Sequence, residues 1–289
     1  MYGVLPYLSW IAILGAPSVV VLVWIIQTKR RHVAQGRRPF TVQPLRVAGE
    51  STRERADELF ESASDDMLLL LAGPLAVAFL GIAAKPSSWL ILAILFAGVT
   101  VGSAWLGMRI RRKLKKSWNY RLGAIGEQVV GRELDQLMAQ GYQVFHDVQF
   151  GNWNIDHVVV GPKGVFAVET KTWRKPNLGS NVSAKIVFNG DALSVPGKWT
   201  SDGAIQQARD NARSLSKWIA KAAAENVPVI PVVALPGWSL EMERFGDVAV
   251  FSAAKMGEPM IRRGNDDLRP EQIQRICFQL AKCCEVTSQ

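Results

Sequence analysis

Apolar residues follow two different spacings along the chain. In the first part they form three long runs, each long enough to cross a bilayer as a helix, at residues 4–26, 67–84 and 89–108. From about Tyr120 onwards they recur at the spacings of short strands and amphipathic helices. The pattern therefore predicts a membrane region over residues 1–116 and an α/β domain over residues 117–289.

The three runs are predicted to be transmembrane helices. The alternative, three buried core helices, exceeds what a domain of this size buries. Trp89 and Trp105 stand near the ends of the third run, where aromatic anchors meet the membrane interface. No run contains Asp, Glu, Lys or Arg, so a transport path is not indicated. The first run has no basic segment before it and is not expected to be a cleaved signal peptide.

The basic residues predict the orientation of the chain. Its formal net charge is +9, and the turn between the second and third runs carries only Lys85. The positive-inside rule then places the N-terminus outside the cell membrane, loop 27–66 inside, and the C-terminal domain in the cytoplasm. The same residues are expected to lie on anionic lipids, so the net charge by itself does not indicate nucleic acid. The clusters comprise Lys29, Arg30, Arg31, Arg37 and Arg38 after the first run, and Arg109, Arg111, Arg112, Lys113, Lys115 and Lys116 after the third.

The second part of the chain predicts a mixed central sheet flanked by helices. Strands are predicted at residues 143–149, 155–160, 165–170, 229–235 and 248–251, with a further hairpin over 184–195. Helices are predicted at residues 51–64 within the polar loop, at 122–140 with Gly141 as its stop, at 202–225, and from Arg269 or Pro270 to about Cys284.

One segment, from Asp156 to Lys171, carries the candidate chemistry. An apolar strand follows Asp156, a Gly-Pro-Lys-Gly turn reverses the chain, and a second apolar strand ends in Glu169-Thr170-Lys171. Because side chains alternate along a strand, Glu169 and Lys171 share one face, and the turn brings Asp156 onto the neighbouring strand. Two carboxylates and a lysine at adjacent strand ends suit Mg²⁺ and phosphodiester cleavage. A solvated Glu–Lys pair is the alternative, but it does not explain why so apolar a strand ends opposite an Asp.

Other reactive side chains carry less information. The three cysteines form no Cys-x-x-Cys pair and the three histidines lack the spacing of zinc ligands, so a zinc site is not indicated. His157 faces away from Asp156 on the same strand and is expected to pack. Trp173, Arg174 and Lys175 either stack on bases and bind phosphates, or form an aromatic core edge beside an exposed basic loop.

Two stretches of the domain resemble a known family. Gly123-Ala-Ile-Gly-Glu127-Gln-Val-Val, followed by Asn154-Ile-Asp156-His-Val-Val-Val-Gly-Pro-Lys-Gly-Val-Phe-Ala-Val-Glu169-Thr-Lys171, is similar to the nuclease-related domain, NERD. That family belongs to the PD-(D/E)xK, or restriction-endonuclease-like, superfamily. The resemblance covers about Leu122 to Leu215 and implies a restriction-endonuclease-like core that cleaves nucleic acid with Mg²⁺ or Mn²⁺.

The resemblance also assigns roles to particular residues. It implies that Asp156, Glu169, the backbone carbonyl of Thr170 and, directly or through water, Glu127 hold the metal ion. Lys171 is expected to stabilise charge on the phosphate or to position the attacking water. The set of candidate catalytic residues is Asp156, Glu169, Lys171, Glu127 and Gln207.

The assignment of Gln207 leaves one alternative. Gln206 is its immediate neighbour, so the matching glutamine is shifted by one residue if the helix is aligned differently. The family often has a proline near the start of this helix, where Ala204 stands in this chain.

Two functions are expected from these observations. The first is a membrane-anchored, metal-dependent nuclease that hydrolyses DNA or RNA at the cytoplasmic face. The second is a catalytically silent nuclease-like module that binds nucleic acid or a partner protein at the membrane. The resemblance also allows a homodimer, because many nucleases of this fold cut both strands as dimers.

Overall fold

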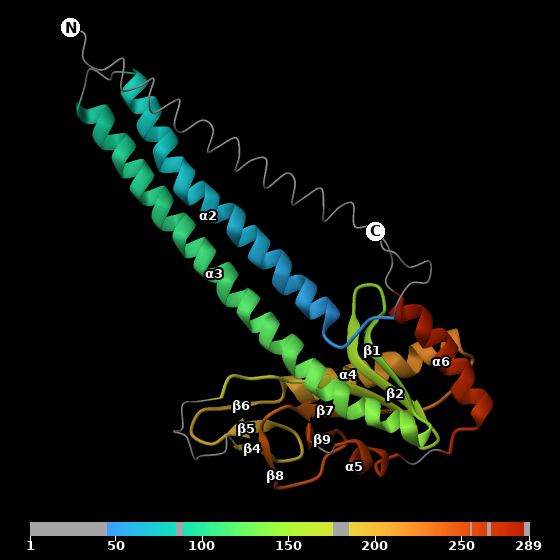
Figure 1. Ribbon diagram of the computed structural model, residues 1–289. Coiled ribbons are helices and arrows are strands. Elements are labelled where there is room, and N and C mark those ends of the chain that lie inside the picture. The colour runs from blue at the N-terminus through green and yellow to red at the C-terminus, as the bar shows by residue number, and fades with distance from the viewer. Residues whose placement is uncertain (1–44, 85–88, 176–184, 255, 265–266, 286–289) are drawn as a thin grey trace. The chain divides into compact units, whose positions relative to one another are not determined.

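The computed structural model describes residues 45–84, 89–175, 185–254, 256–264 and 267–285 (Figure 1). All of them belong to one compact unit, Pro44–Gln289. The first predicted span, residues 4–26, and the start of the predicted loop, residues 27–44, lie outside the described residues.

Two helices within the described residues, α2 (Glu50–Ala84) and α3 (Trp89–Asp135), are long and apolar enough to cross a membrane. Their most apolar windows are 11% and 0% buried inside the protein, which disfavours the alternative of core helices. Exposed side chains such as Ile94 and Phe96 show the same pattern, at 63% and 76%. The predicted number of transmembrane helices, three, is therefore not supported, because the described residues contain two candidates.

Both helices are longer than their apolar runs. Residues 50–66 were predicted as part of a loop with a short surface helix, but they continue without a break into the apolar part of α2. Likewise α3 runs from Trp89 through the basic cluster to Asp135, although the sequence predicts a new helix at Leu122. Arg, Lys and Leu are good helix formers, so the cluster has no reason to interrupt the helix. The predicted boundary between residues 116 and 117 thus falls inside α3, and the division into two domains stays a prediction.

Polar contacts join the two helices near the domain. Lys113 Nζ lies 2.5 Å from Asp66 Oδ2 and also donates to the Ser62 hydroxyl. Ser117 is fully buried and its hydroxyl donates to the carbonyl oxygen of Ala56 at 2.7 Å. These buried, charge-assisted and hydroxyl contacts fix the register of α2 on α3.

A five-stranded mixed sheet forms the centre of the domain, in the order β1-β2-β3-β7-β9 (Figure 1). The first three strands are antiparallel, and the last two run parallel to β3. The predicted mixed α/β core is confirmed, and its strand positions agree with the sequence within one or two residues. The strands are β1 (Gln143–Gln149), β2 (Asn154–Gly161), β3 (Gly164–Thr170), β7 (Val229–Leu235) and β9 (Ala249–Ser252).

Helices cover both faces of this sheet, so β3 is buried along its whole length. Val165 and Ala167 pack towards α4 (Gly203–Ala222) and α6 (Pro270–Cys284). The alternate residues, Phe166 and Val168, pack towards the end of α3 and the short helices on the other face. Those short helices are the 3₁₀ segment η1 (Gln136–Gln140), which ends at Gly141 in the left-handed region, and α5 (Gly257–Ile261).

A second, smaller sheet has the order β6-β5-β4-β8. The sequence predicts the β4–β5 hairpin but misses β6 and β8, because these strands are short and mostly exposed and so lack an apolar alternation. The α5 helix, at five residues, is missed for the same shortness. The strands are β4 (Lys185–Phe188), β5 (Leu193–Val195), β6 (Trp199–Ser201) and β8 (Ser239–Met242).

Candidate active site

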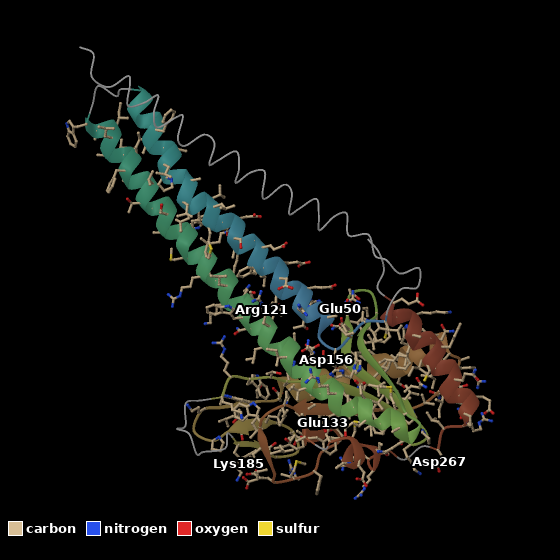
Figure 2. The ribbon with its side chains drawn as sticks, in the orientation of Figure 1. Glu50, Arg121, Glu133, Asp156, Lys185 and Asp267 are labelled. Carbon is tan, nitrogen blue, oxygen red and sulfur yellow. The ribbon has the colours of Figure 1, made fainter. Side chains whose placement is uncertain are left out.

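The β2–β3 hairpin places Asp156 opposite Glu169. The strands are antiparallel with His157 paired to Val168, so the next position along each strand brings the two acids face to face. The Asp156 carboxylate is fixed there because Oδ2 accepts a hydrogen bond from the backbone N–H of Thr170 at 2.7 Å. Asp156 lies beside α3, between the labelled Arg121 and Glu133 (Figure 2).

Glu169 and Lys171 contact each other across one face of β3. Glu169 is 4% exposed, and its Oε1 lies 2.8 Å from Lys171 Nζ. Its Oε2 accepts a hydrogen bond from Asn211 Nδ2 at 2.9 Å, and Lys171 Nζ donates to Gln207 Oε1 at 2.8 Å. Gln207 and Asn211 are four residues apart and therefore share one face of α4. It is thus Gln207 that contacts Lys171.

Glu127 reaches the same region from α3. It is 6% exposed, and its Oε1 accepts a hydrogen bond from the hydroxyl of Thr52 in α2 at 2.8 Å. The helix comes this close because the preceding residue is Gly126, where an added Cβ would lie 1.8 Å from Thr172 Oγ1. A larger residue there would push Glu127 away from the end of β3.

The three carboxylates lie in surroundings that favour their protonated forms. Burial raises the pKa of Glu127 to about 7, aided by the charges of Asp147 and Glu169 and opposed by the hydrogen bond from Thr52. Burial, and then the charges of Glu169 and Glu127, raise the pKa of Asp156 well above its usual value. Burial also raises the pKa of Glu169, although Lys171 and Asn211 oppose the change. Lys171 is the cation that acts on all three groups, so the cluster is short of positive charge.

The donor set fits a divalent metal ion by its chemistry. Carboxylate oxygens are the hard ligands that Mg²⁺ prefers, and the shortage of positive charge is what such an ion would relieve. Thr170, whose backbone carbonyl is a predicted ligand, ends β3 at this point, and its buried hydroxyl has no hydrogen-bond partner. Even so, the described part of the chain has no group of three or more His, Cys, Asp or Glu side chains arranged to hold a metal ion.

His157 and Trp173 lie elsewhere, where they pack. His157 is fully buried on the opposite face of β2, and its Nδ1 lies 2.9 Å from Nδ1 of His146. Burial, and then His146, lower the pKa of His157 well below its usual value, so its ring is neutral. Trp173 stacks edge-to-face on Trp199, with ring centroids 4.8 Å apart, against the core of the small sheet.

Three residues near the site were not predicted from the sequence. Asn211 could have been identified by its spacing, because it lies one helical turn after Gln207 and so on the same face of the helix. The sequence gives a weaker indication for Asp147, which is a charged residue within a predicted strand. In the structure it is fully buried and has a positive φ of 47°. No sequence pattern indicates Thr52, since 75 residues separate it from Glu127.

Comparison with known proteins identifies a family for the segment that contains the site. Residues 122–236 match the family described as the nuclease-related domain, and this segment contains all five candidate catalytic residues. An uncharacterized protein from Bacillus anthracis is 38% identical over 68 residues, which are 22% of this chain and 32% of the relative. The chain therefore spans about a third of the length of that relative. No solved structure gives a significant match. The family expected from the motifs is supported for the segment that builds the site.

Proposed function

We propose that the domain is a metal-dependent nuclease of the PD-(D/E)xK type, which hydrolyses phosphodiester bonds of DNA or RNA. The observation that carries the proposal is the meeting of two buried carboxylates, Glu127 and Glu169, with the half-buried carboxylate of Asp156 and one lysine, where β2, β3 and α3 converge. Clustered acids with too few cations beside them destabilise the folded protein, and such clusters are typical of functional sites. The match to the nuclease-related domain over the same residues supports this reading.

Each residue then has a defined task. Asp156, Glu169, the Thr170 carbonyl and Glu127 would hold Mg²⁺ or Mn²⁺, which supplies charge neutralisation at the phosphate and a more acidic bound water. The Thr170 N–H fixes Asp156, and Asn211 fixes Glu169. The Lys171 ammonium group stabilises negative charge that develops on the phosphate. Gln207 holds that ammonium group by accepting one of its hydrogen bonds.

The apolar parts of α2 and α3 are proposed to anchor this domain in the cell membrane. Their exposed apolar side chains support the proposal, as does the basic cluster that follows the apolar part of α3. In this arrangement the N-terminus is outside and the site faces the cytoplasm. Arg109, Arg111 and their basic neighbours then lie close to anionic headgroups.

A second candidate function has one observation in its favour. The carboxylates accept hydrogen bonds from Lys171, Asn211, Thr52 and the Thr170 N–H, and the described residues do not form a ready metal cage. A silent module that binds nucleic acid or a partner protein would retain such a closed arrangement. The two functions differ in whether added metal enters the cluster and supports cleavage.

The test uses the full chain in detergent micelles. A fragment starting at residue 117 would remove Thr52 and Arg46 from their buried partners. Single- and double-stranded DNA and RNA are incubated with Mg²⁺, Mn²⁺ or EDTA, using the wild type, Asp156→Ala and Lys171→Ala. Lys163→Ala is the matched control, because Lys163 pairs with exposed Asp267 outside the site.

Metal-dependent cleavage that Asp156→Ala and Lys171→Ala lose and Lys163→Ala keeps is the expected result. Binding of nucleic acid without cleavage, by a folded chain that binds Mn²⁺, would favour the silent module. Cleavage that survives in both site variants would place the active site elsewhere.

A further inference from the structure

Residues 45–52, here called the strap, comprise the segment before α2 and the first three residues of that helix, and they are attached to three parts of the domain. The backbone N–H of Arg46 donates to the Cys284 carbonyl at the end of α6, at 2.8 Å. Leu45 forms an antiparallel bridge with Glu285. Ala48 lies so close to α3 that a Cβ added to Gly131 would be 2.9 Å from its methyl group. The strap is therefore part of the folded domain.

Asp147 of β1 fixes the end of the strap. Its Oδ2 accepts hydrogen bonds from the Arg46 guanidinium at 3.0 Å and from the Ser51 N–H at 2.8 Å. Its Oδ1 accepts from the Ser51 hydroxyl at 2.6 Å and from Gln149 Nε2 at 2.9 Å. Because the Ser51 N–H belongs to the first turn of α2, Asp147 also acts as a carboxylate cap for that helix.

Gly49 brings the strap into contact with α3 one turn before Glu127. Its φ is 75°, in the left-handed region, and an added Cβ would lie 2.8 Å from the Ala124 carbonyl oxygen. Ala124 and Glu127 are three residues apart, so they lie on one face of α3. Thr52 lies three residues after Gly49, in the first turn of α2, and its hydroxyl contacts Glu127.

Both branches of the Thr52 side chain are in contact with α3. Its methyl carbon faces Gly123, where an added Cβ would lie at 3.4 Å, and its hydroxyl donates to Glu127 Oε1 at 2.8 Å. The Thr52 hydroxyl is thus the group that fixes Oε1 of this carboxylate. Asp147, Glu169 and Asp156 repel the charged form of Glu127, and the Thr52 hydrogen bond and the charge of Lys171 oppose that repulsion.

We propose that Thr52 is a positioning residue for the acidic cluster. Its hydroxyl holds the Glu127 carboxylate beside Asp156 and Glu169, so that Oε2 is available to a divalent cation. The rest of the strap and Asp147 hold Thr52 in turn, which ties the first turn of α2 to the affinity of the site for metal. This inference rests on the proposed function, because it assumes that the cluster binds a divalent ion.

The test measures Mn²⁺ affinity of the full chain in micelles by calorimetry, without nucleic acid. Thr52→Val keeps the shape of the side chain and removes the hydroxyl, so Mn²⁺ binding should weaken about tenfold, as for other residues that orient metal ligands. Thr52→Ser keeps the hydroxyl and should restore affinity to near the wild-type value. Thr100→Val is the matched control, because the Thr100 hydroxyl bonds only within α3, to the Phe96 carbonyl.

A double-mutant cycle separates positioning from a general loss of structure. If Thr52 acts through Glu127, then Thr52→Val should have no further effect on affinity in a chain that carries Glu127→Gln. Equal Mn²⁺ affinity of the wild type and Thr52→Val, or additive losses in the cycle, would overturn the inference and leave the nuclease proposal standing. A wild type that binds no Mn²⁺ would overturn both.

Discussion

The single carboxylate of Asp147 and the cluster of Glu127, Asp156 and Glu169 have different surroundings, although both contact residues in the first turn of α2. Asp147 accepts four hydrogen bonds, one of them from the Arg46 guanidinium, and its side chain is completely shielded from solvent. Glu127, Asp156 and Glu169 share the charge of one lysine. The chain can evidently satisfy a buried acid where it serves structure. The shortage of positive charge in the cluster is what the proposed metal ion would relieve, and the variants below test that contrast.

Asp156→Asn should have the largest effect on activity and little cost in stability. Losing a metal ligand removes several kcal/mol of transition-state stabilisation, so the cleavage rate should fall about a thousandfold. In the absence of metal the melting temperature should hold or rise, because one of three repelling charges is gone. Initial rates and thermal melts of the full chain measure the two effects. Asp267→Asn is the control, at a side chain that is 83% exposed; a similar loss of rate there would break the comparison.

Asp147→Asn should show the reverse pattern. An amide cannot neutralise Arg46, and its NH₂ group meets donors where the carboxylate had accepted hydrogen bonds. The free energy of unfolding should fall by about 3 kcal/mol, the usual cost of breaking a buried ion pair. Chemical denaturation followed by tryptophan fluorescence measures it. Asp191→Asn, at a 70% exposed ion pair with Arg244, should cost less than about 1 kcal/mol. Equal losses from the two variants would mean that Asp147 is not a structural anchor.

The acidic cluster should also make metal-free stability depend on pH. Glu127 has a pKa of about 7 in the folded chain and 4.5 as its ordinary value, so the folded state binds its proton more tightly. The resulting stabilisation is complete below about 4.5 and is lost as pH rises towards about 7. The melting temperature without metal should therefore fall over that range, and Glu127→Gln should flatten the curve. A curve of the same slope in both chains would assign the dependence to other groups.

The smallest expected effect concerns two neighbouring glutamines. Gln207→Ala removes one acceptor of the Lys171 ammonium group, a single hydrogen bond at a solvent-exposed position. A contribution of about 1 kcal/mol corresponds to a cleavage rate lowered about fivefold. Gln206→Ala should leave the rate unchanged. The opposite ranking would shift the assignment by one residue along α4.

The sequence predicts those parts of the fold whose signal is local. Strands β1, β2 and β3 and helices α4 and α6 have strong apolar periods, and the structure places them within a few residues of the prediction. Strand alternation and a four-residue turn are enough to bring Asp156 to Glu169. The sequence predicts a helix at residues 51–64 but not its unbroken continuation into the apolar run. The helical course of residues 109–121 was missed, because a basic segment has the same composition in a loop and in an exposed helix.

The less predictable part of the site comes from long-range packing. Thr52 reaches Glu127 only because Gly49, Gly123 and Gly126 allow close approach of α2, α3 and the end of β3. From the sequence, Asp147 is an unfavourable residue for a buried strand. The hydrogen-bond donors that satisfy its carboxylate come mainly from the strap, which is distant in sequence. Both contacts join segments that are 75 or more residues apart, and no single local pattern encodes them.

The unbroken course of α3 fixes a distance and a rotational phase. About 28 Å of helix separates Met108, at the end of the apolar run, from Glu127, and each residue turns the helix by about 100°. One residue inserted in that interval would swing Glu127 to another side of the helix and also move Lys113 or Ser117 out of step with α2. The interval can therefore change length only in near-whole turns matched by both helices. The height of the acidic cluster above the apolar end of the pair is set in steps of about 5.4 Å.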